Sequence, residues 1–130
     1  MRKLIVNADD FGMCESINKG IIYGFKNGIV TSASLMVNRP AAQRAAQLAK
    51  ENPKLGVGLH FDFNDFPKEI IKIFKKIKTI EMVKEIDREI TTPGIITKAK
   101  KIFEEQIRKF KELVGSGWCF GANDPPVFCF

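Results

Sequence analysis

Short segments rich in β-branched residues alternate with helix-length amphipathic segments over the first 63 residues. The pattern predicts strands at residues 4–6, 29–37 and 55–63, with helices at 15–27 and 40–49 between them. The first apolar run, Leu-Ile-Val, is typical of a strand that is buried on both faces of a parallel sheet. A strand–helix–strand alternation predicts parallel strands joined by right-handed crossovers. We therefore expect an α/β fold with parallel strands and flanking helices.

The remainder of the chain is dominated by helical patterns rather than strand patterns. Apolar side chains recur at helical spacing in residues 70–77 and 82–90, Thr91-Thr92-Pro93-Gly94 interrupts the pattern, and a strong helix is predicted at residues 98–114. The side chains expected on the buried side of this last helix are Ile102, Phe103, Ile107, Phe110, Leu113 and Val114. Residues 116–130 show no period. We expect a domain at 1–115 followed by an atypical tail at 116–130.

Two adjacent carboxylates, Asp9 and Asp10, follow the first predicted strand closely, together with Asn7. The carboxyl edge of parallel strands is where ligands bind and chemistry takes place in open α/β sheets and in βα barrels. Neighbouring carboxylates repel each other, and a bound cation relieves that repulsion. The pair therefore predicts either a metal site or an acid/base site.

His60 is the only histidine of the chain and lies near the end of the third predicted strand. If the first and third strands are close, His60 reaches the same sheet edge as Asp9 and Asp10. An imidazole with one or two carboxylates suits Zn²⁺, Mg²⁺ or Mn²⁺. One aspartate would then bind the ion while the other acts as a base. The competing interpretation is that a single histidine on a strand has only a structural role.

The charge distribution and the hydropathy indicate which classes of binding partner to expect. The formal net charge is +6, and residues 68–112 contain thirteen Lys and Arg against eight Asp and Glu. These charges are interleaved along amphipathic helices, which favours solvated helix faces over a nucleic-acid surface. Since no apolar run reaches a membrane span and no signal peptide is evident, we expect a cytoplasmic protein without a membrane partner. Cys14 is either a nucleophile or inert packing.

Three segments in register resemble the YdjC-like carbohydrate deacetylases, which include the chitooligosaccharide deacetylases. These are Asn7-Ala8-Asp9-Asp10-Phe11-Gly12, Thr31-Ser32-Ala33-Ser34-Leu35-Met36-Val37-Asn38 and Gly58-Leu59-His60-Phe61, and their order and spacing agree over residues 1–63. The segment 104–110 is similar to a helix of that family. The resemblance implies a βα-barrel-like enzyme, here partial.

The resemblance also implies a reaction and a set of roles. A family member would remove N-acetyl groups from amino-sugar oligosaccharides with a divalent metal, usually Mg²⁺. By position, Asp9 corresponds to the general base, whereas Asp10 and His60 correspond to metal ligands. Residues 31–38 would form a strand that shapes the site without an obvious catalytic role. These implied roles agree with general chemistry, because a metal polarises a carbonyl and activates water while a base accepts the proton.

The chain departs from the family pattern after residue 115. Family members are longer and continue with a strand that carries Asp and several His, one of them a metal ligand, whereas residues 117–124 contain no histidine. We therefore expect a C-terminally truncated or altered member with weak metal binding, in which the activity is either retained or lost. A sheet edge left open by missing strands would also favour homo-oligomers.

A phospho-receiver signalling module is the alternative. Such modules begin with a buried strand that ends in paired acids and place an acceptor aspartate after the third strand, where Asp62 stands. They also need a late strand that ends in lysine, and the chain does not supply one. A basic nucleic-acid-binding domain is the third and least favoured hypothesis.

Overall fold

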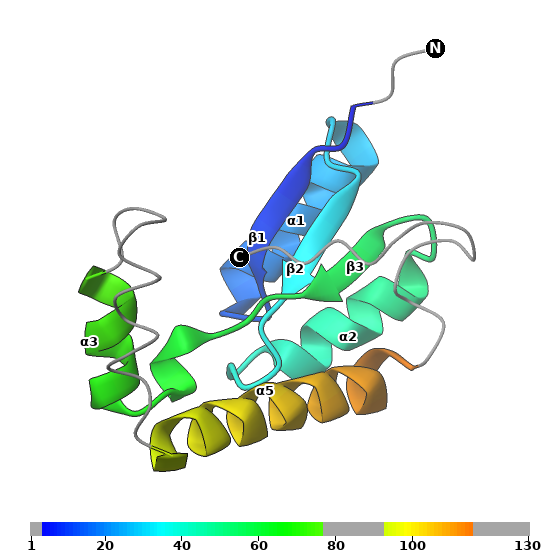
Figure 1. The fold of residues 1–130 in the computed structure, drawn as a ribbon. Helices are drawn as coiled ribbons and strands as arrows, with labels where there is room; N and C mark the ends of the chain where they lie inside the picture. The colour runs from blue at the N-terminus through cyan, green and yellow to red at the C-terminus, as the bar shows by residue number, and fades with distance from the viewer. Residues whose placement is uncertain (1–3, 77–92, 116–130) are drawn as a thin grey trace. The chain divides into compact units, whose positions relative to one another are not determined.

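The computed structural model describes residues 4–76 and 93–115 of the chain (Figure 1). The described residues fall into two compact units, one from residues 4–61 and 106–115, the other from residues 62–76 and 93–105. The elements in chain order are β1 (Asn7–Phe11), α1 (Glu15–Asn27), β2 (Ser32–Leu35), α2 (Ala42–Glu51), β3 (Gly56–Leu59), the 3₁₀ turn η1 (Phe63–Asp65), α3 (Lys68–Lys76) and α5 (Pro93–Val114).

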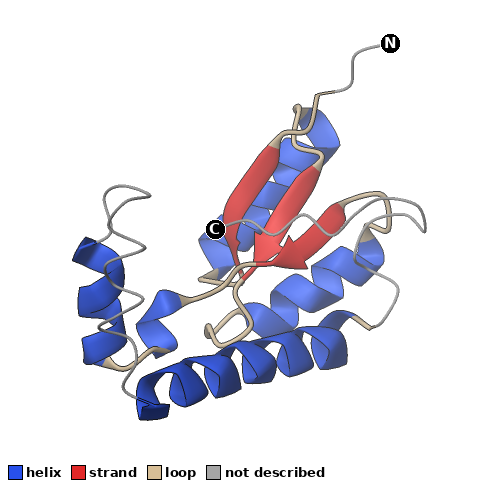
Figure 2. Cartoon of the chain, in the orientation of Figure 1, coloured by secondary structure: helices blue, strands red, loops and turns tan. Residues whose placement is uncertain are grey.

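The first unit is built on a parallel sheet with strand order β1-β2-β3 (Figure 2). Ser32 pairs with Asn7 on one side and with Gly56 on the other, and both strand pairs are parallel. Helices α1 and α2 contact each other and pack on β1 and β2 respectively, so they cover the same face of the sheet. The predicted α/β class with parallel strands and flanking helices is confirmed. Within the described residues the sheet has these three strands.

The first strand lies further along the chain than the sequence pattern predicts. Leu4 and Ile5 are 78% and 62% exposed and precede β1, so the prediction of a buried strand at residues 4–6 is wrong. The backbone of Val6 still bonds to the next strand, because its carbonyl accepts from the N–H groups of Thr31 and Ser32 at 2.9 and 3.2 Å. Asp9 and Asp10 therefore lie inside the strand rather than beyond it. Apolarity alone could not show where the ladder begins.

The predicted helices of the first half are confirmed. Helix α1 runs over the predicted residues 15–27 and buries Ile21 and Ile22. Gly28 follows as the C-cap residue, and glycine suits this position because a Cβ there would lie 2.8 Å from the Gly24 carbonyl oxygen. Helix α2 begins at Ala42, two residues later than Pro40, and its buried residues are Ala42, Ala45, Ala46 and Ala49. Small side chains let this helix approach the sheet closely.

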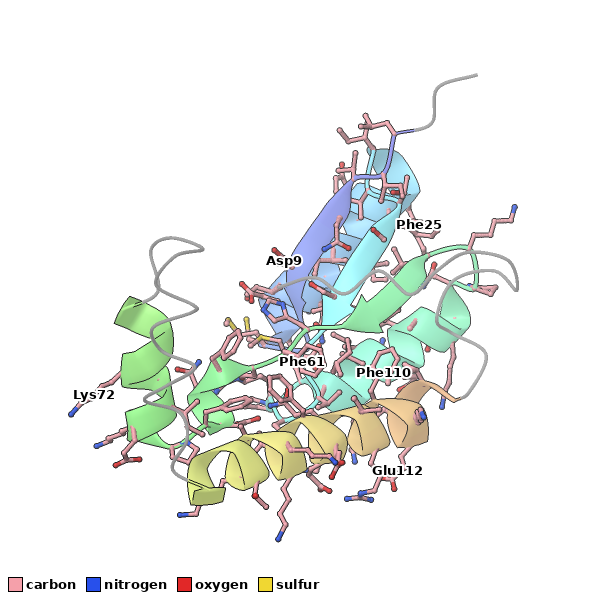
Figure 3. The ribbon with its side chains drawn as sticks, in the orientation of Figure 1. Asp9, Phe25, Phe61, Lys72, Phe110 and Glu112 are labelled. Carbon is pink, nitrogen blue, oxygen red and sulfur yellow. The ribbon has the colours of Figure 1, made fainter. Side chains whose placement is uncertain are left out.

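The core of the first unit combines the inner face of the sheet with the end of α5. Leu55, Val57, Leu59 and Phe61 are all buried, which confirms the predicted alternation around β3. On α5, Phe110 and Val114 are buried as predicted, while Glu112 points outward (Figure 3). The other side chains that were predicted to be buried on this helix are only half-buried: Ile102, Phe103, Ile107 and Leu113. Gln106 is fully buried although its polar side chain gave no reason to expect it there.

The turn after β1 is held by buried polar contacts around Asn18. The Gly12 N–H donates to Asn18 Oδ1 at 2.7 Å, and Asn18 Nδ2 donates to the Ala41 carbonyl at 3.1 Å. The Ala41 N–H in turn donates to the Gly12 carbonyl at 3.0 Å. Asn18 is completely buried, so these bonds replace the water that its amide would otherwise contact. One side chain of α1 thus joins the end of β1 to the start of α2.

The second unit contains η1, α3 and the first part of α5. Phe66 is 4% exposed and lies 4.8 Å from Phe103, ring centroid to ring centroid, in an edge-on arrangement. Helix α5 begins at Pro93, five residues before the predicted start, because a proline is well accommodated in a first helical turn. The predicted stripe at residues 82–90 and the tail at 116–130 lie outside the described residues. In the described part, none of the helices is both long and apolar enough to cross a membrane.

Candidate active site

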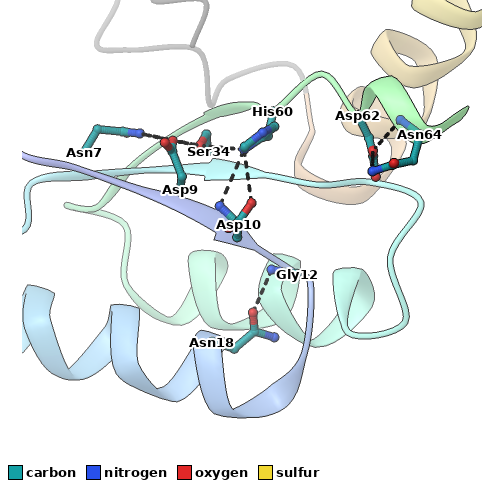
Figure 4. Close-up of polar contacts among 9 residues, drawn as sticks. All are labelled: Asn7, Asp9, Asp10, Gly12, Asn18, Ser34, His60, Asp62 and Asn64. Atoms are coloured by element: carbon teal, nitrogen blue, oxygen red, sulfur yellow. Dashed lines mark hydrogen bonds and ion pairs between the residues drawn. The ribbon is translucent and has the colours of Figure 1, made fainter. Parts of the chain in front are cut away.

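Asp9 is held on the sheet face opposite α1 and α2 by two side-chain donors. Its Oδ1 accepts from Ser34 Oγ at 2.6 Å and from Asn7 Nδ2 at 2.9 Å (Figure 4). Leu35, the next residue on β2, lies on the helix side, since its Cδ1 approaches Gly12. Alternation along the strand therefore turns Ser34 toward the other face. In the part of the chain that the structure describes, nothing donates to Asp9 Oδ2.

A β-bulge brings the two aspartates to the same place. The register with β2 shifts between Ala8 and Phe11, so that β1 has one residue more than its partner, and Asp10 has a φ of 63°. In a regular strand Asp9 and Asp10 would point to opposite faces, and one carboxylate would meet the helices. The extra residue removes that alternation locally. Phe11 is then completely buried, while both carboxylates remain partly accessible.

His60 directly follows β3 and faces the aspartates. Its Nδ1 lies 3.9 Å from Asp10 Oδ1, 3.5 Å from the Asp10 backbone nitrogen and 3.2 Å from Ser34 Oγ. The side chains of His60 and Asp10 are 21% and 42% exposed, so the pair is partly shielded and still reachable from solvent. The expectation that His60 and the Asp pair meet at the carboxyl ends of the strands is thus met in the geometry.

The donor set fits a divalent cation in part. A carboxylate oxygen and an imidazole nitrogen are ordinary ligands for Mg²⁺, Mn²⁺ or Zn²⁺, and Asp10 Oδ1 lies 3.9 Å from the nearer ring nitrogen of His60. A complete site needs at least one more ligand. Among the described residues, no group of three His, Cys, Asp or Glu side chains is placed to hold a metal.

Ser34 is the site residue that sequence analysis missed. Residues 31–38 were expected to shape the site without an obvious role, yet Ser34 contacts both Asp9 and His60. Ser32 lies on the same face of β2 and donates to Asn7 Oδ1 at 2.8 Å, which orients the amide that supports Asp9. The available signal was a serine at every second position of an otherwise apolar strand. Such spacing places both hydroxyls on one face of a buried strand.

Asp62, the acceptor in the phospho-receiver hypothesis, has a structural environment. It is 3% exposed, and its Oδ1 accepts from the Asn64 backbone N–H at 2.9 Å and from Asn64 Nδ2 at 3.0 Å. These bonds cap η1 at its start. A phosphate acceptor must be reached by its donor, so the burial of Asp62 does not favour the receiver hypothesis.

Cys14 immediately precedes α1 and is partly exposed. Its Sγ lies 3.1 Å from Ser16 Oγ. A hydrogen bond from the Ser16 hydroxyl lowers the pKa of the Cys14 thiol below its ordinary value, and a hydrogen bond from the Ile17 backbone N–H lowers it further. Both donors stabilise the thiolate at the start of the helix.

We expect Cys14 to be alkylated by iodoacetamide faster at pH 7 than an ordinary exposed cysteine, because a lowered pKa increases the thiolate fraction. Ser16→Ala should raise the pKa and move the midpoint of the labelling pH profile upward. Peptide-resolved mass spectrometry measures Cys14 separately from Cys119 and Cys129. An unchanged midpoint in Ser16→Ala would show that the hydroxyl has no influence on the thiol.

Comparison with known proteins identifies the family. A family model described as YdjC-like protein matches residues 3–120. The chain belongs to the YdjC-like family. A carbohydrate deacetylase of Geobacillus stearothermophilus is 62% identical over 60 residues, which are 46% of this chain and 24% of that protein. A chitooligosaccharide deacetylase of Salmonella newport is 55% identical over 60 residues, again 46% of this chain and 24% of that protein. The predicted resemblance to YdjC-like carbohydrate deacetylases is confirmed.

A further relative shows the same partial coverage. A carbohydrate deacetylase of Clostridium beijerinckii is 64% identical over 58 residues, which are 45% of this chain and 24% of that protein. The matched part of this YdjC-like chain thus spans about a quarter of the length of these curated relatives.

Proposed function

We propose that this YdjC-like chain takes part in the metal-dependent hydrolysis of N-acetyl groups on amino-sugar oligosaccharides. The observation that carries the proposal is the meeting of Asp9, Asp10 and His60 on one face of the sheet, with 3.9 Å between Asp10 Oδ1 and His60 Nδ1. The deacetylase names of relatives at 55–64% identity supply the reaction class and the substrate class. A βα-barrel-like closure of the sheet is part of the same proposal.

Asp9 is the general base in this proposal. Two donors hold its Oδ1, which fixes the carboxylate plane and leaves Oδ2 as the oxygen that accepts a proton from the attacking water. A general base must first be positioned so that one carboxylate oxygen can reach the proton of the water, and its proton affinity matters only after that. Asp9 is also exposed, so water and substrate can reach it.

Asp10 and His60 would hold the divalent ion. When bound, the ion would polarise the acetyl carbonyl and lower the pKa of its water. Mg²⁺ is our first choice because of the family resemblance, with Zn²⁺ and Mn²⁺ as alternatives that an imidazole ligand suits well. Because the described residues supply two ligands, we expect weak binding and a reduced or absent activity of the 130-residue chain by itself.

The proposed partners are an N-acetylated oligosaccharide and further copies of the chain. In the described sheet, the outer edge of β1 has no strand beside it, and the neighbouring Leu4 and Ile5 are largely exposed. An open edge next to apolar side chains favours association of copies.

The experiment that tests the function is acetate release from diacetylchitobiose by the 130-residue chain with Mg²⁺, Mn²⁺ or Zn²⁺. We expect any release to require metal and to be lost on addition of a chelator. Equal release with and without metal would contradict the proposed chemistry. No release at saturating metal would contradict an active deacetylase and support an inactive chain that keeps the family fold.

Asp10→Asn tests the metal ligand separately from turnover. We expect this variant to bind Mn²⁺ at least about tenfold more weakly, because the amide lacks the charge that attracts the cation. Asparagine also tolerates a positive φ, so the backbone at residue 10 should remain unstrained. Broadening of the His60 ring signals by Mn²⁺ provides the measurement, since the chain has one histidine.

The matched control for Asp10→Asn is Asp65→Asn, which removes a carboxylate from η1 in the other unit. Its Mn²⁺ affinity should equal that of the unmodified chain. Equal affinities for Asp10→Asn and the unmodified chain would remove Asp10 from the ligand set.

A further inference from the structure

Ser34 occupies the point where the proposed base and the proposed imidazole ligand meet. The side chain lies on β2 and is 1% exposed. Its Oγ is 2.6 Å from Asp9 Oδ1 and 3.2 Å from His60 Nδ1 (Figure 4). These contacts join β1, β2 and the end of β3 through a single hydroxyl group. Water cannot easily replace that hydroxyl, because almost no surface of Ser34 is open to solvent.

The Ser34 hydroxyl has a single hydrogen, so it can donate a hydrogen bond to only one of its two neighbours, Asp9 and His60. An ionised carboxylate can only accept hydrogen bonds, so the 2.6 Å contact requires Ser34 to donate its hydrogen to Asp9. The oxygen then has only lone pairs to present to His60. A contact of 3.2 Å with Nδ1 is favourable when Nδ1 carries a hydrogen and donates it.

We propose that Ser34 is a positioning residue that fixes the carboxylate of Asp9 and, in the metal-free protein, the ring orientation and Nδ1–H tautomer of His60. The inference rests on the proposed function for the roles of Asp9 and His60. It goes beyond that function because it names a serine on β2 as the group that aligns the two. In a histidine site, the partner of one ring nitrogen commonly sets the orientation and tautomer of the ring.

A competing contact makes the proposal testable in the unmodified chain. The Asp10 backbone N–H also points at His60 Nδ1, at 3.5 Å, and that bond would require a bare Nδ1. The Ser34 contact at 3.2 Å lies within the ordinary range of a hydrogen bond, whereas 3.5 Å lies beyond it, so we expect Nδ1–H to dominate. A neutral histidine without a hydrogen-bond partner at Nδ1 carries its hydrogen mainly on Nε2.

Nitrogen-15 NMR of the imidazole measures the tautomer of His60 directly. The spectrum is recorded without metal and at a pH where His60 is neutral. The chain has one histidine, so the two ring signals need no assignment to a residue. We expect the Nδ1–H pattern in the unmodified chain and a shift toward Nε2–H in Ser34→Ala. Ser34→Cys, of similar size but with a sulfur that is a weak acceptor and a weak donor, should lie between the two.

Ser32→Ala is the matched control, because Ser32 is also a buried serine on the same face of β2 and bonds Asn7 rather than His60. Its imidazole spectrum should equal that of the unmodified chain. An Nε2–H pattern in the unmodified chain, an unchanged pattern in Ser34→Ala, or equal shifts in both alanine variants would overturn the positioning role.

Kinetics give a second measurement where the chain releases acetate. We expect Ser34→Ala to lower kcat by about tenfold with little change in KM, because the base remains present but is no longer aligned. A kcat in Ser34→Ala equal to that of the unmodified chain would overturn the role. If no variant releases acetate, the proposed function fails, while the imidazole spectra still decide whether Ser34 positions His60.

Discussion

Replacing Asp9 with asparagine is expected to lower the rate of metal-dependent acetate release by at least about a hundredfold, the usual contribution of a general base. Asparagine has the shape of aspartate and keeps an oxygen that can accept from Ser34 Oγ and Asn7 Nδ2. It cannot take a proton from water, however. Initial rates with diacetylchitobiose at saturating metal would measure the loss, and thermal unfolding would verify that the fold is retained.

Metal affinity separates the proposed role of Asp9 from the proposed role of Asp10. The Asp9→Asn variant should bind Mn²⁺ with nearly the affinity of the unmodified chain, whereas Asp10→Asn should bind it weakly. The distances support this division, because Asp10 Oδ1 lies 3.9 Å from His60 Nδ1 while Asp9 Oδ1 is engaged by two donors. A loss of affinity in Asp9→Asn with normal affinity in Asp10→Asn would mean that the two roles are reversed.

Gly12→Ala is expected to lower the free energy of unfolding by about 3 kcal/mol, from an unfavourable backbone conformation combined with overpacking. Gly12 has a φ of +97°, which side-chain-bearing residues rarely adopt. An added Cβ would also lie 3.0 Å from the Met36 carbonyl oxygen and 3.2 Å from the Ala42 Cα. These neighbours are backbone atoms and cannot rotate away. Urea denaturation monitored by circular dichroism would measure the change.

Gly20→Ala provides the control for the effect of adding a methyl group. Gly20 lies within α1, and a Cβ there meets nothing within 4 Å. Alanine should therefore raise the free energy of unfolding by about 0.5–1 kcal/mol through its better helix propensity. A cost below about 1 kcal/mol for Gly12→Ala would show that the turn after β1 relaxes easily.

The arrangement of helices and strands in the first unit followed from local patterns in the sequence. The period of Ile21 and Ile22 with their neighbours predicted α1, and the alternation from Leu55 to Phe61 predicted β3. The start of β1 could not be found in this way, because Leu4 and Ile5 have strong strand propensity and yet lie outside the sheet. Where a strand begins depends on hydrogen bonds to a neighbour, and apolarity does not encode them.

The members of the candidate site and their meeting at one edge of the sheet were predicted, whereas the backbone conformation that brings them together was not. Asp9, Asp10 and His60 were identified from their positions after predicted strands. Their convergence depends on a β-bulge and on a left-handed backbone at Asp10, and neither has a signal in the residue types. Ser34 was overlooked because a serine in a buried strand has many structural explanations. Its importance becomes visible only from two distances, to Asp9 Oδ1 and to His60 Nδ1.

The left-handed backbone of Asp10 has a consequence for how such a chain can change over evolutionary time. Glycine, asparagine and aspartate tolerate a φ of 63° best, and of these only aspartate carries a charge. Aspartate codons become asparagine or glycine codons by a single nucleotide change. Such a mutation would erase the proposed ion ligand while leaving the fold intact, so a descendant without that ligand can persist as a stable protein and acquire another role.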